Sequence, residues 1–87
     1  MNKEEAKQFL SNYFSFNDFD KKELESDSYL DCSCADLTPE GWQTKFEFFD
    51  TFCLVHNFPY YKGERIGDSS TEWIQYSDFE HYIKEWF

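Results

Sequence analysis

Three cysteines and one histidine are the residues of this chain whose types could hold a metal ion. Cys32 and Cys34 form a Cys-x-Cys pair, and Cys53 and His56 follow as Cys-x-x-His. Three thiolates and one imidazole are the ligand set of a tetrahedral structural zinc site. Zinc knuckles usually space their cysteines by two residues or more, and a buried core position explains Cys53 as well. We therefore expect no metal and no cofactor, and keep this Cys3His set as a lesser alternative.

Catalytic constellations are not evident in the sequence. A cysteine nucleophile needs a neighbouring base and positive surroundings, whereas Cys32 and Cys34 lie among Asp27, Asp31 and Asp36. The serines and histidines form no nucleophile-elbow motif, and the glycine spacing does not match a phosphate-binding loop. The chain has eighteen carboxylates, so any two of them could be proposed as a catalytic acid and base, and such a pair is no evidence for catalysis. We expect a protein that is not an enzyme.

Acidic side chains dominate the polar chemistry of the chain. Eight Lys and Arg stand against eighteen Asp and Glu, which leaves a net charge of −10 at pH 7. From Glu23 to Thr44 there is no basic residue. A field of this sign repels nucleic acids and anionic membranes and steers the chain towards basic surfaces. The expected partner is a basic protein, with no direct contact to nucleic acid or membrane.

Carboxylates spaced along a rigid scaffold can imitate the phosphates of a nucleic acid, and exposed aromatic rings can anchor the contact. The side chains expected to bind the partner are Glu23, Glu25, Asp27, Tyr29, Asp31, Asp36, Glu40, Glu47, Asp50, Tyr60, Tyr61 and Trp73. In size, charge and aromatic content the chain resembles small acidic inhibitors, namely nuclease immunity proteins, anti-restriction proteins and anti-CRISPR proteins. The net charge, the base-free run from Glu23 to Thr44, the small size and the lack of a catalytic constellation predict an inhibitor that masks the basic nucleic-acid-binding or active-site surface of a nuclease or another nucleic-acid-handling protein.

Two other functions fit the same sequence. One is an α-helical interaction or accessory domain that holds its partner by aromatic side chains instead of charge. The other is a small zinc-stabilised domain that uses Cys32, Cys34, Cys53 and His56.

The length of 87 residues suits one small acidic domain, residues 1–87. Aromatic residues make up 23% of the chain, so the core is expected to be rich in rings. The first ten residues are polar and lack the apolar run of a secretory signal, and no segment has the length of a membrane span. Three cysteines do not make a disulfide framework. These features predict a cytoplasmic protein.

Three helices follow from capping signals and apolar spacing. Asn2 and Glu5 have the capping-box spacing, which predicts a helix over about 3–14. Asn17 is the expected cap of a short helix over about 18–26. Ser77 and Glu80 form a second capping-box pattern, which predicts a helix over 77–87.

The segment 38–57 is predicted to be the long helix on which the core is built. Thr38 and Pro39 suit a helix start, and Trp42, Phe46, Phe49 and Cys53 form an apolar stripe at helical spacing. Residues 42–48 also alternate as a half-buried strand would, after a turn at 39–41. The alternation fails at Phe49 while the helical pattern continues, so helix is preferred.

Two alternative structures are compatible with the sequence of residues 59–76. A hairpin across Gly67-Asp68 fits the strand-like composition of 71–76, and a helical turn capped at Ser69 fits Glu72. The predicted fold is therefore mostly α: a bundle of three to four helices (about 3–14, 18–26, 38–57 and 77–87), with the option of a short β-hairpin within 59–76.

Overall fold

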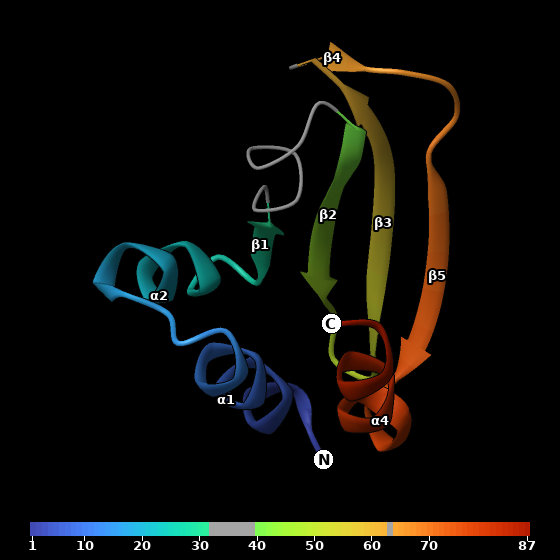
Figure 1. Cartoon of the computed structure of the whole chain (residues 1–87). Coiled ribbons are helices and arrows are strands. Elements are labelled where there is room, and N and C mark those ends of the chain that lie inside the picture. Colours follow the sequence, from blue (N-terminus) through green and yellow to red (C-terminus); the bar gives the residue numbers. More distant parts are fainter. Residues whose placement is uncertain (32–39, 63) are drawn as a thin grey trace.

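The chain has a mixed α/β fold, in which helices pack on an antiparallel, curled sheet (Figure 1). The computed structural model describes residues 1–31, 40–62 and 64–87. Within them lie three helices and five strands: α1 (Lys3–Tyr13), α2 (Asp18–Leu24), β1 (Ser28–Asp31), β2 (Glu40–Phe48), β3 (Phe52–Tyr61), β4 (Glu64–Arg65), β5 (Ser70–Gln75) and α4 (Tyr76–Trp86). The predicted mostly α bundle of three to four helices is wrong.

The sheet is built around the pair β2–β3. β1 pairs with the outer edge of β2, while the far edge of β3 pairs with β5 along one half and with β4 at the other end. Every pairing is antiparallel. The register matches Phe46 with Val55 and Phe48 with Cys53.

The predicted helix over 38–57 is instead a hairpin of β2 and β3, and this is the main correction. The alternation of residues 42–48 is that of a strand, and it stops at Phe49 because the chain turns there. The Phe49 N–H donates to the Phe52 carbonyl oxygen (2.9 Å), which closes the turn through Asp50 and Thr51. Aromatic and β-branched residues fill both strands and favour the pleated surface. The expected cap at Thr38–Pro39 lies outside the described residues.

Residues 59–76 contain strands and no helical turn at Ser69. β3 turns back into β4, so that Tyr60 pairs with Arg65 and Tyr61 with Glu64. β5 then returns along β3 and pairs with its first half, from Phe52 to Asn57. The hairpin is therefore formed by β3 and β4 and not across Gly67-Asp68, which lies in the connection from β4 to β5.

The three helices at the ends of the chain are confirmed. Asn2 and Glu5 form the predicted capping box of α1, and Asn17 caps α2 through the backbone N–H of Asp20 (2.8 Å). The cap expected at Ser77 is wrong, because α4 already begins at Tyr76 and its N-cap position is Gln75. The hydroxyl of Tyr76 donates to the carbonyl of Phe49, which ties the start of α4 to the β2–β3 turn.

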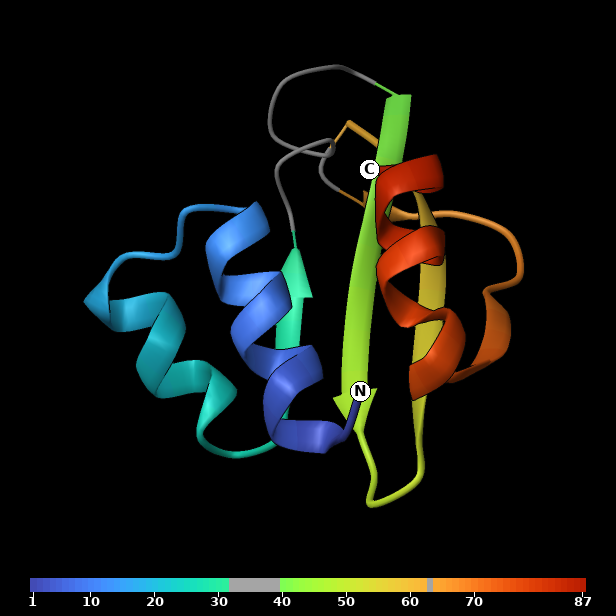
Figure 2. The same ribbon diagram turned by 90° about the horizontal axis from the view of Figure 1, so that it is seen from below.

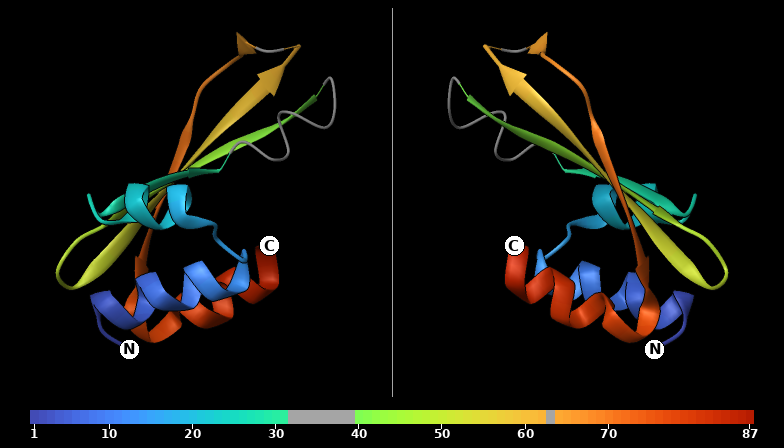
Figure 3. Two further views of the ribbon diagram at one scale, coloured as in Figure 1. Left: turned by 90° about the vertical axis from the view of Figure 1, so that its left-hand side faces the viewer. Right: turned by 90° about the vertical axis from the view of Figure 1, so that its right-hand side faces the viewer.

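Helices α1 and α4 lie side by side on one face of the sheet, while α2 packs beside α1 and β1 (Figure 2). Edge-on views show that the sheet extends past this helical layer, and that no helix of the described residues lies on its other face (Figure 3). We call these the helix-covered face and the open face. Because successive residues of a strand point to opposite faces, Phe46 and Phe48 face the helices and Lys45 and Glu47 do not.

The core lies between the helix-covered face and the helices. Phe46, Val55 and Cys53 of the sheet are fully buried. The other buried apolar residues are Ala6, Leu10, Phe16, Leu24, Phe48, Tyr76, Phe79 and Ile83. Ring contacts join the layers, among them Phe48 with Phe79 (5.8 Å between centroids) and Phe9 with Phe79 (6.3 Å). The expectation of an aromatic-rich core is confirmed.

Asp27 connects α1 to the sheet. Its carboxylate accepts from Lys3 Nζ (2.6 Å) and from Lys7 Nζ (2.8 Å), and its carbonyl accepts from the Phe48 N–H (2.8 Å). Its backbone has φ of +62°, a left-handed conformation that Asp and Asn tolerate better than most residues. The hydrogen bonds from Lys3 and Lys7 hold the pKa of Asp27 below its ordinary value of 3.8.

No helix in the described parts of the chain is both long and apolar enough to cross a bilayer.

Replacing Phe46 tests the position of the core. Phe46→Ala removes a fully buried ring, so it should lower the free energy of unfolding by about 3–5 kcal/mol, measured by urea titration. If that variant does not fold, Phe46→Leu should still show a loss of about 1–2 kcal/mol. Phe19 is 77% exposed on α2, so Phe19→Ala is the matched control and should change little. Equal losses for Phe46→Ala and Phe19→Ala would contradict this core.

Asp27→Asn keeps the residue shape and its tolerance of positive φ, and removes only the charge that binds the lysines. The variant should melt about 4–8 °C below the wild type at pH 7. Because the folded pKa of Asp27 is lowered, its contribution is present above the unfolded pKa and disappears as the pH falls through the folded value. The difference in melting temperature between the two proteins should therefore shrink towards pH 3. Asp68→Asn, in the exposed connection to β5, is the control. A difference that is constant with pH would contradict the role of the charge.

Candidate functional site

An open pocket lies on the helix-covered face, beside the last turn of α4. Its volume is about 370 Å³, at the small end of the roughly 300–1,000 Å³ typical of ligand pockets. The described residues that line it are Asp31, Trp42, Thr44, Asn57, Ser70, Glu72, Tyr82, Trp86 and Phe87. We call this cavity the α4 pocket.

Strand register places the polar floor of the α4 pocket. Asp31 pairs with Thr44, Thr44 with Asn57, and Asn57 with Ser70, so four polar residues form one row across β1, β2, β3 and β5. The neighbouring row on the same face contains the buried pair Phe46 and Val55. The pocket thus begins where this face of the sheet changes from apolar to polar.

Hydrogen bonds connect this floor to α4. Thr44 is 4% exposed, and its hydroxyl donates to Asn57 Oδ1 (3.0 Å). The hydroxyl of Tyr82, on α4, interacts with the side chains of Asn57 and Glu72. Burial raises the pKa of Tyr82, and the bond to Glu72 raises it further. Tyr82 therefore stays protonated and orients Glu72 at the pocket wall.

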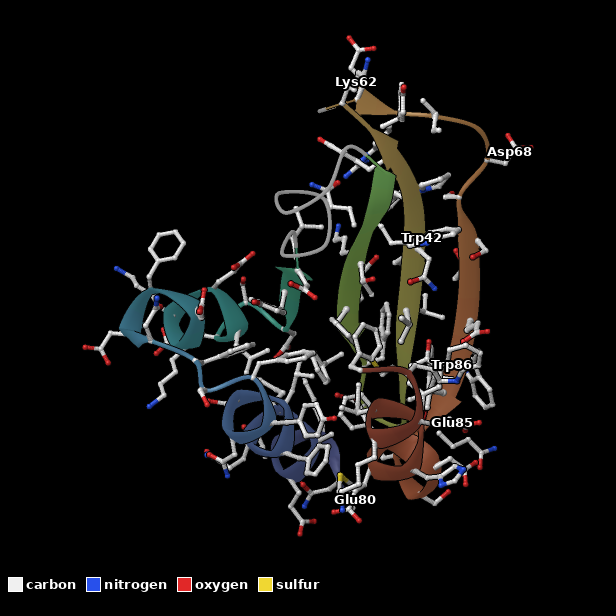
Figure 4. All side chains as sticks on the ribbon, viewed as in Figure 1. Trp42, Lys62, Asp68, Glu80, Glu85 and Trp86 are labelled. Carbon is white, nitrogen blue, oxygen red and sulfur yellow. The ribbon has the colours of Figure 1, made fainter. Side chains whose placement is uncertain are left out.

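Aromatic rings form the outer walls of the α4 pocket. Trp42 comes from β2 and is 54% exposed, and Trp86 comes from the last turn of α4 and is 66% exposed (Figure 4). Phe87 lies next to Trp86 along the chain and contacts Tyr82 and Phe46. The rings of both tryptophans are therefore accessible to a ligand.

The charge of the α4 pocket is negative. Asp31 and Glu72 contribute carboxylates, and none of the nine described lining residues is basic. Among the described residues, Glu72 has no cationic partner within an ion-pair distance. Such a site disfavours anions and favours cations.

The predicted partner-binding carboxylates do not form one array. Asp31 is the member that lines the α4 pocket, while Glu23 and Glu25 belong to α2 and to the residue after it. Asp27 is held by Lys3 and Lys7, so its role is structural. Asp36 lies outside the described residues. Glu40 is the first residue of β2.

Two more of the predicted carboxylates lie near the β2–β3 turn. Asp50, at the turn, has a side chain that is 97% exposed and 3.9 Å from Lys3 Nζ. Glu47, on the open face, accepts from His56 Nε2 (2.7 Å), and His56 Nδ1 contacts the Thr71 hydroxyl (2.9 Å). A shallow depression at this end of the sheet is lined by Asp27, Glu47 and Asp50 together with Lys3 and Lys45. Its mixed charges make it a weaker candidate than the α4 pocket.

The predicted aromatic anchors have different surroundings. Tyr29 packs against the core, with its ring centroid 4.3 Å from that of Phe16. Tyr60 is half-buried in β3, and Tyr61 is 39% exposed with Lys62 Nζ 5.3 Å from its ring centroid. Trp73 is 54% exposed, which fits an anchor.

Trp73 belongs to a row of rings on the open face. Phe49 stacks on Phe52 (4.9 Å between centroids), and Phe52 contacts Trp73 (5.2 Å). At the other end of the same face, the Arg65 guanidinium lies 4.0 Å from the Phe58 ring centroid and donates to Gln43 Oε1 (3.0 Å). The open face thus presents aromatic side chains at both ends. Its basic residue Arg65 is already bound to Phe58 and Gln43.

The structure does not bring the described residues of the zinc alternative together. Cys53 and His56 were placed one helical turn apart, but both belong to β3, where positions three apart point to opposite faces. Cys53 is buried against the helices, whereas His56 binds Glu47 and Thr71 on the open face. Cys32 and Cys34 lie outside the described residues. Among the described ones, no three His, Cys, Asp or Glu side chains are arranged to hold a metal ion.

Sequence reasoning missed most of the α4 pocket. Trp42 was assigned to the apolar stripe of the predicted helix over 38–57. Glu72 was considered only as part of a capping box. The available signal was the alternation of Trp42, Thr44 and Phe46, which places the tryptophan on the core-facing side once the segment is taken as a strand.

Cys53 should be chemically inert in the folded protein. Burial raises the pKa of its thiol from 9.0 to about 12, which lowers the thiolate fraction near pH 8 by about 1,000-fold. In a Cys32→Ser/Cys34→Ser variant, Cys53 is the one remaining thiol. Its reaction with a disulfide reagent should be at least about 100-fold slower in native buffer than in urea. Similar rates in the two conditions would contradict the buried position.

Comparison with family models, with curated proteins and with solved structures finds no match for this chain. Its function is therefore argued from its own residues: the surface charge, the α4 pocket and the aromatic row on the open face.

Proposed function

We propose that this chain is a binding module that covers a basic surface of a nuclease or another nucleic-acid-handling protein and thereby inhibits it. The observation that carries the proposal is the surplus of exposed carboxylates. Among the described residues eleven acidic side chains are exposed: Glu4, Glu5, Asp18, Glu25, Asp50, Glu64, Asp68, Glu72, Asp78, Glu80 and Glu85. The exposed basic side chains are Lys21, Lys22, Lys62, Arg65 and Lys84.

Internal contacts of the basic residues increase this imbalance. Lys3 and Lys7 are bound to Asp27, and the Arg65 guanidinium lies on the Phe58 ring. Lys84 lies 3.8 Å from Glu80 on the same helix. The groups that would oppose a cationic partner are thus partly occupied, while carboxylates on α1, α2, α4 and the β2–β3 turn remain outside.

Such a surface acts on a basic partner in two ways. Over distances of up to about 10 Å at moderate salt, its field raises the rate of encounter with a cationic groove. After docking, the carboxylates pair with lysine and arginine side chains that otherwise contact phosphates, so nucleic acid is displaced. Exposed rings such as Trp42, Trp73 and Trp86 supply packed anchors among these charges.

The aromatic row on the open face favours a second candidate function, an interaction domain whose partner is held by apolar contact. Phe49, Phe52 and Trp73 form this row on the open face, which no described helix covers. Apolar contact depends little on salt, which separates the two functions. The helical form of this alternative is excluded by the fold.

A pull-down from source-cell lysate with the tagged chain tests the proposal, with washes at about 50 mM and about 500 mM salt. The expected partner is a basic nucleic-acid-binding protein that is retained at low salt and weakened at high salt. Its association rate with the purified chain should fall at least about tenfold over this range. Nucleic acid should compete with the chain for the partner.

Trp73→Ala provides the comparison between the two functions. Partner binding that tolerates salt but is lost in Trp73→Ala supports the interaction domain held by the open face. A neutral or acidic partner indifferent to salt contradicts the inhibitor proposal.

A further inference from the structure

We propose that the α4 pocket receives an arginine side chain of the basic partner, an inference that rests on the proposed function. Its first support is the charge of the cavity. Two carboxylates, from Asp31 and Glu72, line a volume of about 370 Å³ in which no described residue is basic. An anion would meet repulsion there, and a neutral apolar group would remove water from the carboxylates without replacing it.

The hydrogen-bond pattern leaves room for a cation on Glu72. The Tyr82 hydroxyl donates to this carboxylate, and Asn57 in turn contacts Tyr82. A carboxylate has about four lone-pair sites, so Glu72 can accept further donors after binding Tyr82. The Thr44 hydroxyl donates to Asn57 Oδ1 (3.0 Å), and Tyr82 and Glu72 line the same pocket as this pair.

The walls favour guanidinium over a compact ammonium. Trp42 and Trp86 expose 54% and 66% of their surface and line the pocket from β2 and α4. A planar guanidinium stacks on an indole face and donates two parallel hydrogen bonds to a carboxylate, which a lysine ammonium cannot do in the same geometry. The combination of indole faces with carboxylates therefore fits arginine.

A partner arginine in the α4 pocket also gives a reason for the row of polar residues across the sheet. Asp31, Thr44, Asn57 and Ser70 continue the face that buries Phe46 and Val55, and they line the α4 pocket together with Tyr82, Trp86 and Phe87. An arginine entering from a partner would pack its apolar stem against the rings and its head against this row.

The test is a titration of the purified chain with N-acetyl-arginine methylamide, followed by NMR of the tryptophan indole N–H groups. At about 0.3 kcal/mol for each of the roughly 16 heavy atoms of the probe, the dissociation constant should be of the order of 0.3 mM. The signals of Trp42 and Trp86 should shift and saturate together. The signal of Trp73, on the open face, is the internal control and should not move.

Three matched probes define the chemistry. The citrulline analogue has the shape of arginine without its charge and should bind at least about tenfold more weakly. The lysine analogue should bind more weakly than the arginine probe. Methylguanidinium lacks the stem and backbone of an arginine residue and should also bind more weakly. Stronger binding of methylguanidinium than of the arginine probe would indicate a free small cation as ligand and overturn the proposal.

Variants locate the site. Glu72→Gln and Asp31→Asn should each weaken the arginine probe at least about fivefold. Glu80→Gln removes one exposed acidic charge from α4 without touching the pocket (Figure 4) and should leave binding unchanged. Equal weakening by Glu80→Gln and Glu72→Gln, or no saturable shift up to about 50 mM probe, would overturn the proposal. The titration needs no partner, so failure of the pull-down and failure of the pocket are separate results.

Discussion

The register of β2 against β3 is the constraint on which the rest of this structure depends. Pairing Phe46 with Val55 and Phe48 with Cys53 puts four buried side chains on one face, and a register shift of one residue would turn the two on one of the strands to the opposite face. The same face must therefore receive the helices. The Tyr76 hydroxyl and the Asp27 carbonyl bind backbone groups at Phe49 and Phe48, so α4 and the end of α2 are attached at the closed end of this hairpin.

That attachment also decides where a site can exist. α4 starts at the β2–β3 turn and runs along the helix-covered face, and its last residues reach the row formed by Thr44 and Asn57. In the part of the chain that the structure describes, no helix lies over the sheet beyond this point (Figure 3). Within the polar row, the Thr44 hydroxyl donates to Asn57 Oδ1. The α4 pocket is thus a consequence of a long hairpin combined with a short helix.

The sequence predicts those parts of the fold whose signals are local. The capping box of Asn2 and Glu5 and the cap at Asn17 are read within four residues, and both are present. The helix prediction for residues 38–57 failed because aromatic residues are so frequent there that they fit both the helical and the strand period. There the break in alternation at Phe49 was taken as evidence for helix, whereas it marks a turn. Only pairing with distant strands selects between the two periods.

The same reasoning explains why the candidate site was largely hidden. Asp31, Thr44, Asn57 and Ser70 are far apart in sequence, and only strand pairing makes them neighbours. Asp31 was anticipated for its charge, not for its position. The expected zinc pair failed for a related reason, because Cys53 and His56 share a helix face at their spacing but point to opposite faces of a strand.

Charge and stability oppose each other in this chain. A net charge of −10 on 87 residues produces self-repulsion that a small aromatic core must overcome. Lys3 and Lys7 reduce it at one point only, where Asp27 joins α1 to the sheet. A ligand that binds only the folded state stabilises it by mass action, and a cationic partner would in addition relieve the remaining repulsion. A protein that binds a basic surface can therefore tolerate a charge that costs it stability while it is free.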